Sequence, residues 1–465
     1  MTTSFSLDGS YRRYDRVVIA GSPLRLFRLS VGGQRVVEAI ERQQPLPGGH
    51  SKLTDRLLEA GAIHPRASNS TFTADDVTIV VPAFNQDPSI AGSRGEVIVV
   101  DDGSEPPLTA EGHRLIRLEI NRGPATARNA GLAEVTTPLV AFVDTDVDLD
   151  DGWLESLLPH FNDPLVALVA PRVASTAGST ALARYESARS PLDLGSQQGR
   201  IAAGTRISYV PAAALVVRAD ALRAIGGFDE ALRTGEDVDM VWRLIDAGHR
   251  CRYEPASTVH HRPRATLSRW ARQRLAYGRS AAVLDRKHPG AVAPLRMSGW
   301  SAAVWALVLV RRPIGALTVA AGTIVALRRK LDAIPSAESV RLAGLGHLYA
   351  GRQVASAITR VWWPLALIAA LFVRRTRLPL VAAAIVPALL DRPSARGLAA
   401  RGLAARGLAA RGVADRGPID PIRYVAYRLA DDVAYGTGAW IGAFEQRSIG
   451  ALTPKFTNWP GRTGG

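Results

Sequence analysis

The stretch LVAFVDTDVDLDDGWL, residues 139–154, decides the fold class of this chain. Its first five residues are all apolar, which is typical of a strand buried on both faces of a sheet in an α/β protein. Two similar runs lie upstream, VTIVVPAF at 77–84 and EVIVV at 96–100, and ATARNAGLAEV at 125–135 can form a crossover helix. These elements predict an α/β fold with a Rossmann-like sheet, whose ligands bind at the carboxyl ends of the strands.

Acidic side chains follow the third predicted strand directly. Asp144 and Asp146 are one residue apart, with Thr145 between them. Two carboxylates this close repel each other unless a cation lies between them, so the pair predicts a site for Mg²⁺ or Mn²⁺ bridging to a diphosphate. The alternative interpretation is a solvated acidic turn. The later aspartates of the stretch are expected to cap a following helix: Asp148, Asp150 and Asp151.

The first two predicted strands also end in polar sequences. The first ends in Pro82, Ala83 and, after one more residue, Asn85; the second ends in VDDGS, residues 100–104. Asp102 can accept a hydrogen bond from the N–H of a uracil ring, and Gly103 lets the backbone turn closely around the base. An ordinary Asp-Gly turn is the alternative. The loop from Asn85 to Glu96 is too short for a full helix, which indicates an abbreviated first crossover.

Three further segments carry candidate site residues. In NRGPATARNAG, 121–131, Arg128 falls in the second helical turn, where it can lean toward phosphates or a base, or form a solvated helix face. In GEDVDMVWRLIDAG, 235–248, an amphipathic helix begins with Glu236 and Asp237. The helix N-terminus favours an ionised carboxylate, as a general base requires, although such acids also simply complement the helix dipole. In CRYEPASTVHHRPR, 251–264, one imidazole can join a metal shell, and His261 is favoured over His260.

Composition narrows the function classes. The single cysteine, Cys251, excludes an internal disulfide and fits a reducing compartment. A net charge of +15 suits nucleotide diphosphates, a membrane surface or nucleic acid, but no nucleic-acid-reading motif is recognisable, so no nucleic-acid partner is expected. The N-terminus lacks an apolar core of signal-peptide length, which predicts a cytoplasmic start.

The chain is expected to contain five segments. Residues 1–70 predict a small winged-helix-like module and 75–292 the α/β domain. Residues 293–392 hold short apolar runs separated by arginine clusters, which predicts a helical region on the cytoplasmic side of the cell membrane, peripheral or multi-pass. The five-residue repeat ARGLA indicates that residues 393–416 are a low-complexity linker. Residues 417–465 are expected to form a C-terminal tail.

Taken in order, the motifs VVPAFN, VDDGS, NRGPATARNAG, FVDTD, GGFDE, GEDVD and Y-x-P-x-x-x-V-x-H resemble those of inverting family-two glycosyltransferases of the GT-A fold. The resemblance covers about residues 77–290 and implies a UDP-sugar donor. It implies Asp237 as the catalytic base with Glu236 beside it, and a metal held by Asp144, Asp146 and His261. The implied donor-binding residues are Pro82, Ala83, Asn85, Asp102, Gly103, Arg128, Asn129 and Thr145.

The N-terminal sequences RLFRLSVGGQRVVEAIE and LTDRLLEAGAIHP resemble the PqqD-like peptide-recognition domain of modified-peptide pathways. Its fusion to a family-two domain is similar to the glycosyltransferases of the mycofactocin system. This implies transfer of a β-linked hexose, glucose by resemblance, to a peptide-derived redox cofactor or its precursor peptide. The alternatives are a transferase acting on a lipid or polysaccharide acceptor, a nucleotidyltransferase, and an inactive, membrane-attached peptide-binding scaffold.

Overall fold

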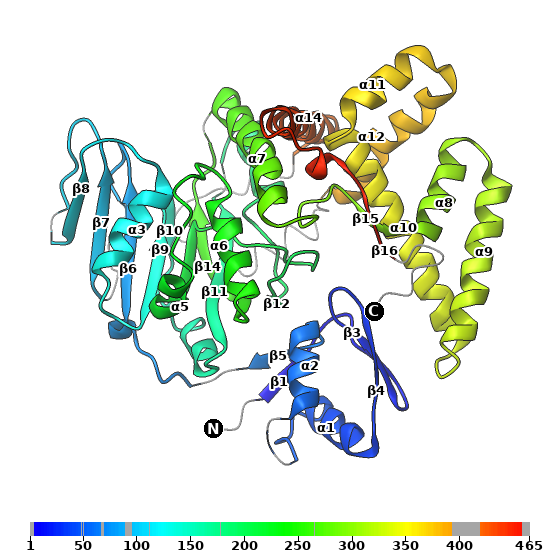
Figure 1. Cartoon of the computed structure of the whole chain (residues 1–465), viewed down its shortest axis with the longest axis horizontal. Coiled ribbons are helices and arrows are strands. Elements are labelled where there is room, and N and C mark those ends of the chain that lie inside the picture. Colours follow the sequence, from blue (N-terminus) through cyan, green and yellow to red (C-terminus); the bar gives the residue numbers. More distant parts are fainter. Residues whose placement is uncertain are drawn as a thin grey trace. The chain divides into compact units, whose positions relative to one another are not determined.

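The computed structural model describes residues 4–47, 49, 51–66, 69–88, 95–110, 112–176, 178–264, 266–392 and 419–457. Two compact units make up the chain (Figure 1). The first, called here the sheet unit, holds Met1–Thr176 and Ser190–Arg262; the second, the helical unit, holds Ala177–Arg189 and Pro263–Gly465. The predicted linker 393–416 lies outside the described residues.

A nine-stranded mixed sheet forms the centre of the sheet unit. Its strands are β6 (Val77–Ala83), β7 (Val97–Asp102), β8 (Arg114–Leu118), β9 (Leu139–Val143), β10 (Val147–Leu149), β11 (Val166–Ser175), β12 (Gly199–Arg200), β13 (Ala214–Arg218) and β14 (Arg250–His261). The order is β10-β14-β11-β13-β9-β6-β7-β8, with β12 paired to β14. Strands β9, β6, β7 and β8 run parallel, so their carboxyl ends meet at one edge, whereas β13 is antiparallel to both β9 and β11.

The central strands are buried because each is a continuous apolar run. Every residue of β7 and β9 is buried, and β6 is buried except at Pro82. Three helices cover the sheet in Figure 1: α3 (Pro124–Glu134) packs on β6 and β7, α5 (Ala219–Ala224) on β13, and α6 (Glu236–Asp246) on β14. Two 3₁₀ turns complete this part, η1 (Ala74–Asp76) and η2 (Leu158–Asn162).

An N-terminal module within the sheet unit has its own apolar core. It consists of β1 (Ser4–Leu7), β2 (Arg12–Tyr14), β3 (Val17–Ala20), β4 (Arg25–Arg28), α1 (Val31–Glu41), α2 (Lys52–Ala60) and β5 (Ile63–Arg66). Strands β2, β3 and β4 form an antiparallel sheet, and β1 pairs with β5. Ser30 and Ser51 cap the two helices, and Gly61 ends α2 in the left-handed conformation that its position predicts.

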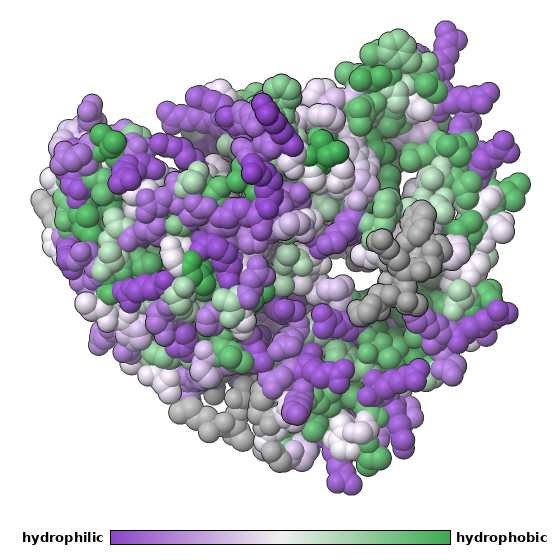
Figure 2. Space-filling view, viewed as in Figure 1, coloured by the Kyte–Doolittle hydropathy of each residue, from purple (hydrophilic) through white to green (hydrophobic). Residues whose placement is uncertain are grey.

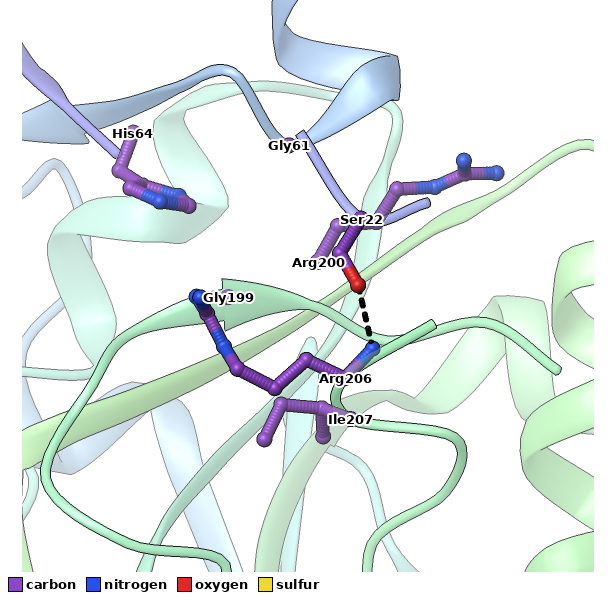
Figure 3. Close-up of a pocket in the computed structure, with 7 residues that line it drawn as sticks. All are labelled: Ser22, Gly61, His64, Gly199, Arg200, Arg206 and Ile207. Atoms are coloured by element: carbon purple, nitrogen blue, oxygen red, sulfur yellow. Dashed lines mark hydrogen bonds between the residues drawn. The ribbon is translucent and has the colours of Figure 1, made fainter. Parts of the chain in front are cut away.

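Polar contacts join this module to the central sheet (Figure 3). The backbone N–H of Arg206 donates to Ser22 Oγ at 2.7 Å, and Arg206 Nη2 lies 2.9 Å from the buried Asp8 carboxylate, which also contacts His64. A small cleft at this junction is lined by Ser22, Gly61, His64, Gly199, Arg200, Arg206 and Ile207. Arg250 on β14 adds an ion pair to Asp55 of α2 at 2.7 Å.

Among the described residues, the helical unit contains eight α-helices, two 3₁₀ turns and one small sheet. The helices are α4 (Ala181–Arg189), α7 (Leu267–Lys287), α8 (Gly299–Leu309), α9 (Pro313–Lys330), α10 (Ser336–Arg360), α11 (Trp363–Phe372), η3 (Arg374–Thr376), α12 (Arg377–Asp391), α14 (Pro421–Glu445) and the short η5 (Gly450–Leu452), the two η elements being single 3₁₀ turns. Strands β15 (Arg296–Ser298) and β16 (Lys455–Thr457) pair in parallel. Helices α7 and α14 pack closely, and Arg274 of α7 lies buried between Glu186 and Asp431.

Of the helices that the structure describes, none alone combines the length and hydropathy of a membrane span. Helices α10 and α11 meet those criteria only as a pair, and their axes meet at 85°.

Several local expectations differ from the structure. No α-helix follows Asp151; instead Asp148 lies in β10 and pairs with Arg262, so the helix-capping prediction is wrong. His260 and His261 are the last two residues of β14, not residues after a short strand. The predicted crossover helix is confirmed as α3, and the helix that begins at Glu236 is confirmed as α6.

Close packing of α3 on the sheet gives a stability prediction. A Cβ placed on Gly131 would lie 2.3 Å from Val80 Cγ1, so Gly131→Ala is expected to lower the free energy of unfolding by about 1–3 kcal/mol. Gly344→Ala in α10 is the matched control, because nothing lies within 4 Å of its added methyl. Denaturant titration measures both, and equal effects at the two positions would contradict the packing argument.

Candidate active site

The two aspartates of the VDDGS motif, residues 100–104, have different roles at the end of β7. Asp101 accepts hydrogen bonds from the backbone N–H groups of Ser104 and Leu108 and pairs with Arg117. Asp102 accepts from the N–H groups of Arg122 and Gly123, both at 2.8 Å. Asp102, predicted to read a base, therefore also fixes the loop that leads into α3.

Tight backbone geometry surrounds these aspartates. Gly103 has φ +73°, and a Cβ there would lie 2.6 Å from the backbone nitrogen of Asn121, so only glycine fits. Asn85, after β6, also has positive φ, at +52°. Its backbone N–H donates to Ser104 Oγ at 2.8 Å, and its Oδ1 accepts from the N–H of Glu105 at 2.9 Å. The strand ends at Pro82, Ala83 and Asn85 thus lie beside the end of β7, as the parallel pairing requires.

Arg128 connects three elements of the site. Its guanidinium on α3 donates to Asp144 Oδ1, just after β9, and to Glu236 Oε1, at the start of α6, both at 2.8 Å. The side chain is 4% exposed and lies over the Phe228 ring. The two carboxylates hold the pKa of Arg128 above its ordinary value despite burial. The interpretation of Arg128 as a solvated helix face is therefore wrong.

The predicted metal ligands lie at the ends of β9 and β14. Asp146 Oδ2 is 3.3 Å from His261 Nε2, and the antiparallel pairing of β10 with β14 places these residues together. His261 is buried, and its Nδ1 has no hydrogen-bond partner among the described residues. Burial raises the pKa of Asp144; the Arg128 cation opposes this, and the Asp146 carboxylate adds to it.

Asp144, Asp146 and His261 are not gathered into one ligand group. Across the described ranges, no three His, Cys, Asp or Glu side chains are arranged to hold a metal ion. Asp144 instead contacts Arg128, and only Asp146 and His261 are adjacent. Thr145, between the aspartates, uses its carbonyl to accept a hydrogen bond from Gln86 at 3.2 Å. The metal assignment therefore stays a prediction.

Asp237 lies in the first turn of α6. Its Oδ1 accepts from the N–H of Val238 at 2.8 Å and its Oδ2 from the N–H of Ala212 at 3.2 Å. Burial, together with the neighbouring Glu236 carboxylate, raises the pKa of Asp237 to about 7. A carboxylate with a pKa near neutrality is both populated and basic enough to take a proton from a hydroxyl group.

Asn129 points toward the loop GGFDE, residues 226–230, and not toward the Asp102 loop. Its amide donates to the Phe228 carbonyl and to Glu230, and its Oδ1 accepts from the Phe228 N–H at 2.8 Å. Thr126 donates to the same Glu230. The sequence alone predicted no role for Phe228 or Glu230. In the sequence, these two residues are marked only by the GGFDE motif. Its two glycines permit the turn at 226–227, where both have positive φ.

Comparisons with known proteins agree with this arrangement of motifs. A family model described as "Glycosyl transferase family 2" matches residues 78–226. A "Pre-mycofactocin glycosyltransferase" from Mycobacterium tuberculosis is 40% identical over 457 residues, which cover 94% of this chain and 94% of that protein. "Glycosyltransferase AglE" from Haloferax volcanii is 29% identical over 202 residues, covering 38% of this chain and 64% of that protein.

One solved structure among the matches is "Mannosyltransferase PcManGT from Pyrobaculum calidifontis in complex with GDP-Man and Mn2+". It shares 16% identity and a TM-score of 0.35, with 61% of this chain and 84% of that chain covered.

The buried guanidinium of Arg128, which pairs with both Asp144 and Glu236, gives a second stability prediction. Arg128→Met leaves Glu236 and Asp144 without their cation, and is expected to cost about 3–5 kcal/mol of unfolding free energy, because uncompensated buried charge is costly. Arg114→Met is the matched control: the Arg114–Glu134 pair is about half exposed on each side, and its loss is expected to cost less than about 1 kcal/mol. Chemical denaturation compares the two. A cost at Arg128 no larger than at Arg114 would contradict the assigned role.

Proposed function

Because the chain belongs to glycosyltransferase family 2, and is therefore a glycosyltransferase, we propose that it moves a hexose from a UDP-sugar to a peptide-derived acceptor with inversion at the anomeric carbon. The observation that carries the site assignment is the buried ion-pair cluster in which Arg128 bridges Asp144 and Glu236, next to Asp237. It brings the strand-end aspartates and the candidate base to one edge of the sheet.

In the proposed reaction, Asp237 takes the proton of an acceptor hydroxyl. The hydroxyl oxygen forms a bond to the anomeric carbon as the bond from that carbon to the diphosphate oxygen breaks, and nucleoside diphosphate leaves. Attack on the face opposite the leaving group inverts the anomeric configuration. Arg128 maintains the position of Glu236, and thus of the first turn of α6 that carries Asp237.

The donor pocket is proposed to include Pro82, Ala83, Asn85, Asp102, Gly103 and Thr145, with Arg128 on α3; Asn129 instead holds the 226–230 loop. The short, hydrogen-bonded turns at Asn85 and Gly103 support this, because a rigid backbone can approach a base closely. Asp102 retains lone pairs beyond its two backbone hydrogen bonds, which leaves it able to accept from a uracil N–H.

A divalent cation, Mg²⁺ or Mn²⁺, fits the chemistry of the residues at the end of β9. Oxygen donors from Asp144 and Asp146 and the His261 imidazole suit such an ion, and the close Asp146–His261 contact supports the pairing. When bound, the ion would stabilise the negative charge of the departing diphosphate as a Lewis acid.

The peptide-derived acceptor is supported by the extent of the similarity. The relative that is named a pre-mycofactocin glycosyltransferase matches 94% of this chain, which includes the N-terminal module and the helical unit as well as the family domain. The module has its own core and is proposed to recognise the peptide, as PqqD-like domains do. A lipid or polysaccharide acceptor is the alternative; an inactive scaffold is set aside because the chain is a transferase.

A direct test uses purified protein, Mn²⁺ or Mg²⁺, a panel of UDP-sugars and either the peptide-derived cofactor core or a polyprenyl phosphate. Mass spectrometry is expected to show hexose-spaced products on the peptide-derived core, and UDP-glucose is expected to be the best donor. Products on the lipid alone would overturn the proposed acceptor while leaving the transferase intact.

The Asp237 assignment predicts a defined pH dependence. The pKa of about 7 means that the basic, deprotonated form is lost as pH falls through 7, so the transfer rate is expected to drop about tenfold per unit below pH 7 and to level off above it.

Asp237→Asn is expected to lower the rate at least 100-fold, in line with typical general-base contributions of about 10²–10⁴. Asp246→Asn, at the exposed end of the same helix, is the control. A wild-type rate in Asp237→Asn refutes the role.

The cation assignment predicts metal-dependent donor binding. Calorimetric titration with UDP is expected to show binding that strengthens with Mn²⁺ and weakens with a chelator in the wild type. Asp146→Asn is expected to lose this metal response, whereas Asp148→Asn, whose carboxylate pairs with Arg262, keeps it. Equal UDP affinity in all these conditions would contradict the assignment.

A further inference from the structure

Three helices of the helical unit contribute almost nothing to its core. Within the described residues, α11 buries no residue, α9 buries only Ala316 and α12 only Ala388. Their side chains are nevertheless mostly apolar, and five of the largest are at least 70% exposed: Ile314, Leu317, Phe372, Leu378 and Leu390. Scattered exposed apolar residues are ordinary, but a set concentrated on three helices that all pack on α10 indicates an interaction surface.

These helices form two hairpins that both pack on α10. Helices α8 and α9 pair with each other, and α11 connects through η3 to α12; α9, α11 and α12 each contact α10. Figure 1 shows the two hairpins extending from α10, and Figure 2 shows hydrophobic residues over α11. The exposed apolar side chains therefore lie on projecting elements, not in a groove.

Basic side chains lie at the hairpin ends. Residues 299–392 contain twelve Lys and Arg against three Asp and Glu, so a partner with negative charge is favoured. The exposed cations gather beside the apolar residues: Arg311, Arg312, Arg328, Arg329, Lys330, Arg374, Arg375 and Arg377. Arg377 also donates to the Ala370 carbonyl at 2.8 Å, and this contact closes the α11–α12 turn around Phe372.

We propose that the α8–α9 and α11–α12 hairpins dock on the anionic, cytoplasmic face of a lipid bilayer. Ile314, Leu317, Phe372 and Leu378 enter the boundary between headgroups and acyl chains, while the arginines remain at the level of the lipid phosphates. A second copy of the chain fits less well, because it would place basic clusters against basic clusters. The proposal does not depend on the sugar or acceptor.

The test is flotation of the full-length protein with vesicles of phosphatidylcholine alone or mixed with phosphatidylglycerol. Wild type is expected to float with the mixed vesicles and to be released by high salt. The double substitution Phe372→Ser, Leu378→Ser is expected to lower the vesicle affinity roughly tenfold or more, in proportion to the apolar burial removed. Arg374→Glu, Arg375→Glu is expected to reduce the preference for phosphatidylglycerol.

Phe444→Ser is the matched control, because Phe444 is 87% exposed on α14, which belongs to neither hairpin, and its loss is expected to leave flotation unchanged. Ile314→Ser, on the other hairpin, gives an independent variant, and thermal melting and sugar transfer to a water-soluble acceptor verify that each variant is folded. The proposal fails if wild type does not float, or if Phe372→Ser, Leu378→Ser floats like Phe444→Ser. It also fails if these substitutions instead abolish a dimer measured by light scattering.

Discussion

The site depends on one buried guanidinium. Arg128 on α3 holds Asp144 at the end of β9 and Glu236 at the start of α6, and both contacts measure 2.8 Å. Helix α3 and the following strand β9 thereby meet α6, whose Glu236 lies 108 residues further along the chain than Arg128. Without that cation, two carboxylates would have to share a poorly hydrated space with Asp146 and Asp237 nearby, which is electrostatically costly.

Parallel strand pairing and glycine geometry place the other polar side chains of the site around the Arg128 guanidinium. Strands β9, β6 and β7 end at the same edge, so the Asn85 and Asp102 turns lie side by side. Close packing of Gly131 on Val80 brings α3 near the sheet and keeps Arg128 within reach of β9. Antiparallel β10 then carries the chain from Asp146 back alongside His261. The backbone thus positions each polar group before any ligand binds.

Much of this arrangement could be predicted from the residue pattern. Continuous apolar runs correctly indicated β6, β7 and β9, and the amphipathic pattern of residues 235–248 indicated α6. Strand β8, at the edge of the sheet, was missed because the arginines at the first and fourth positions of RLIRL, 114–118, interrupt the apolar run. Contacts between distant segments were also inaccessible: nothing local indicates that Asn129 holds the 226–230 loop, or that Arg206 reaches Asp8. The short run before His260 was in fact part of a twelve-residue strand, because β14 gains pairing from β11 along most of its length.

The most direct measurement is a crystal structure of the full chain with UDP-hexose and Mn²⁺, with anomalous scattering used to locate the ion. The account predicts the ion beside Asp146 and His261, the diphosphate in contact with it, and the uracil near Asp102. An ion and donor bound away from the ends of β7 and β9, with the Asp144 and Asp146 oxygens facing solvent, would contradict it.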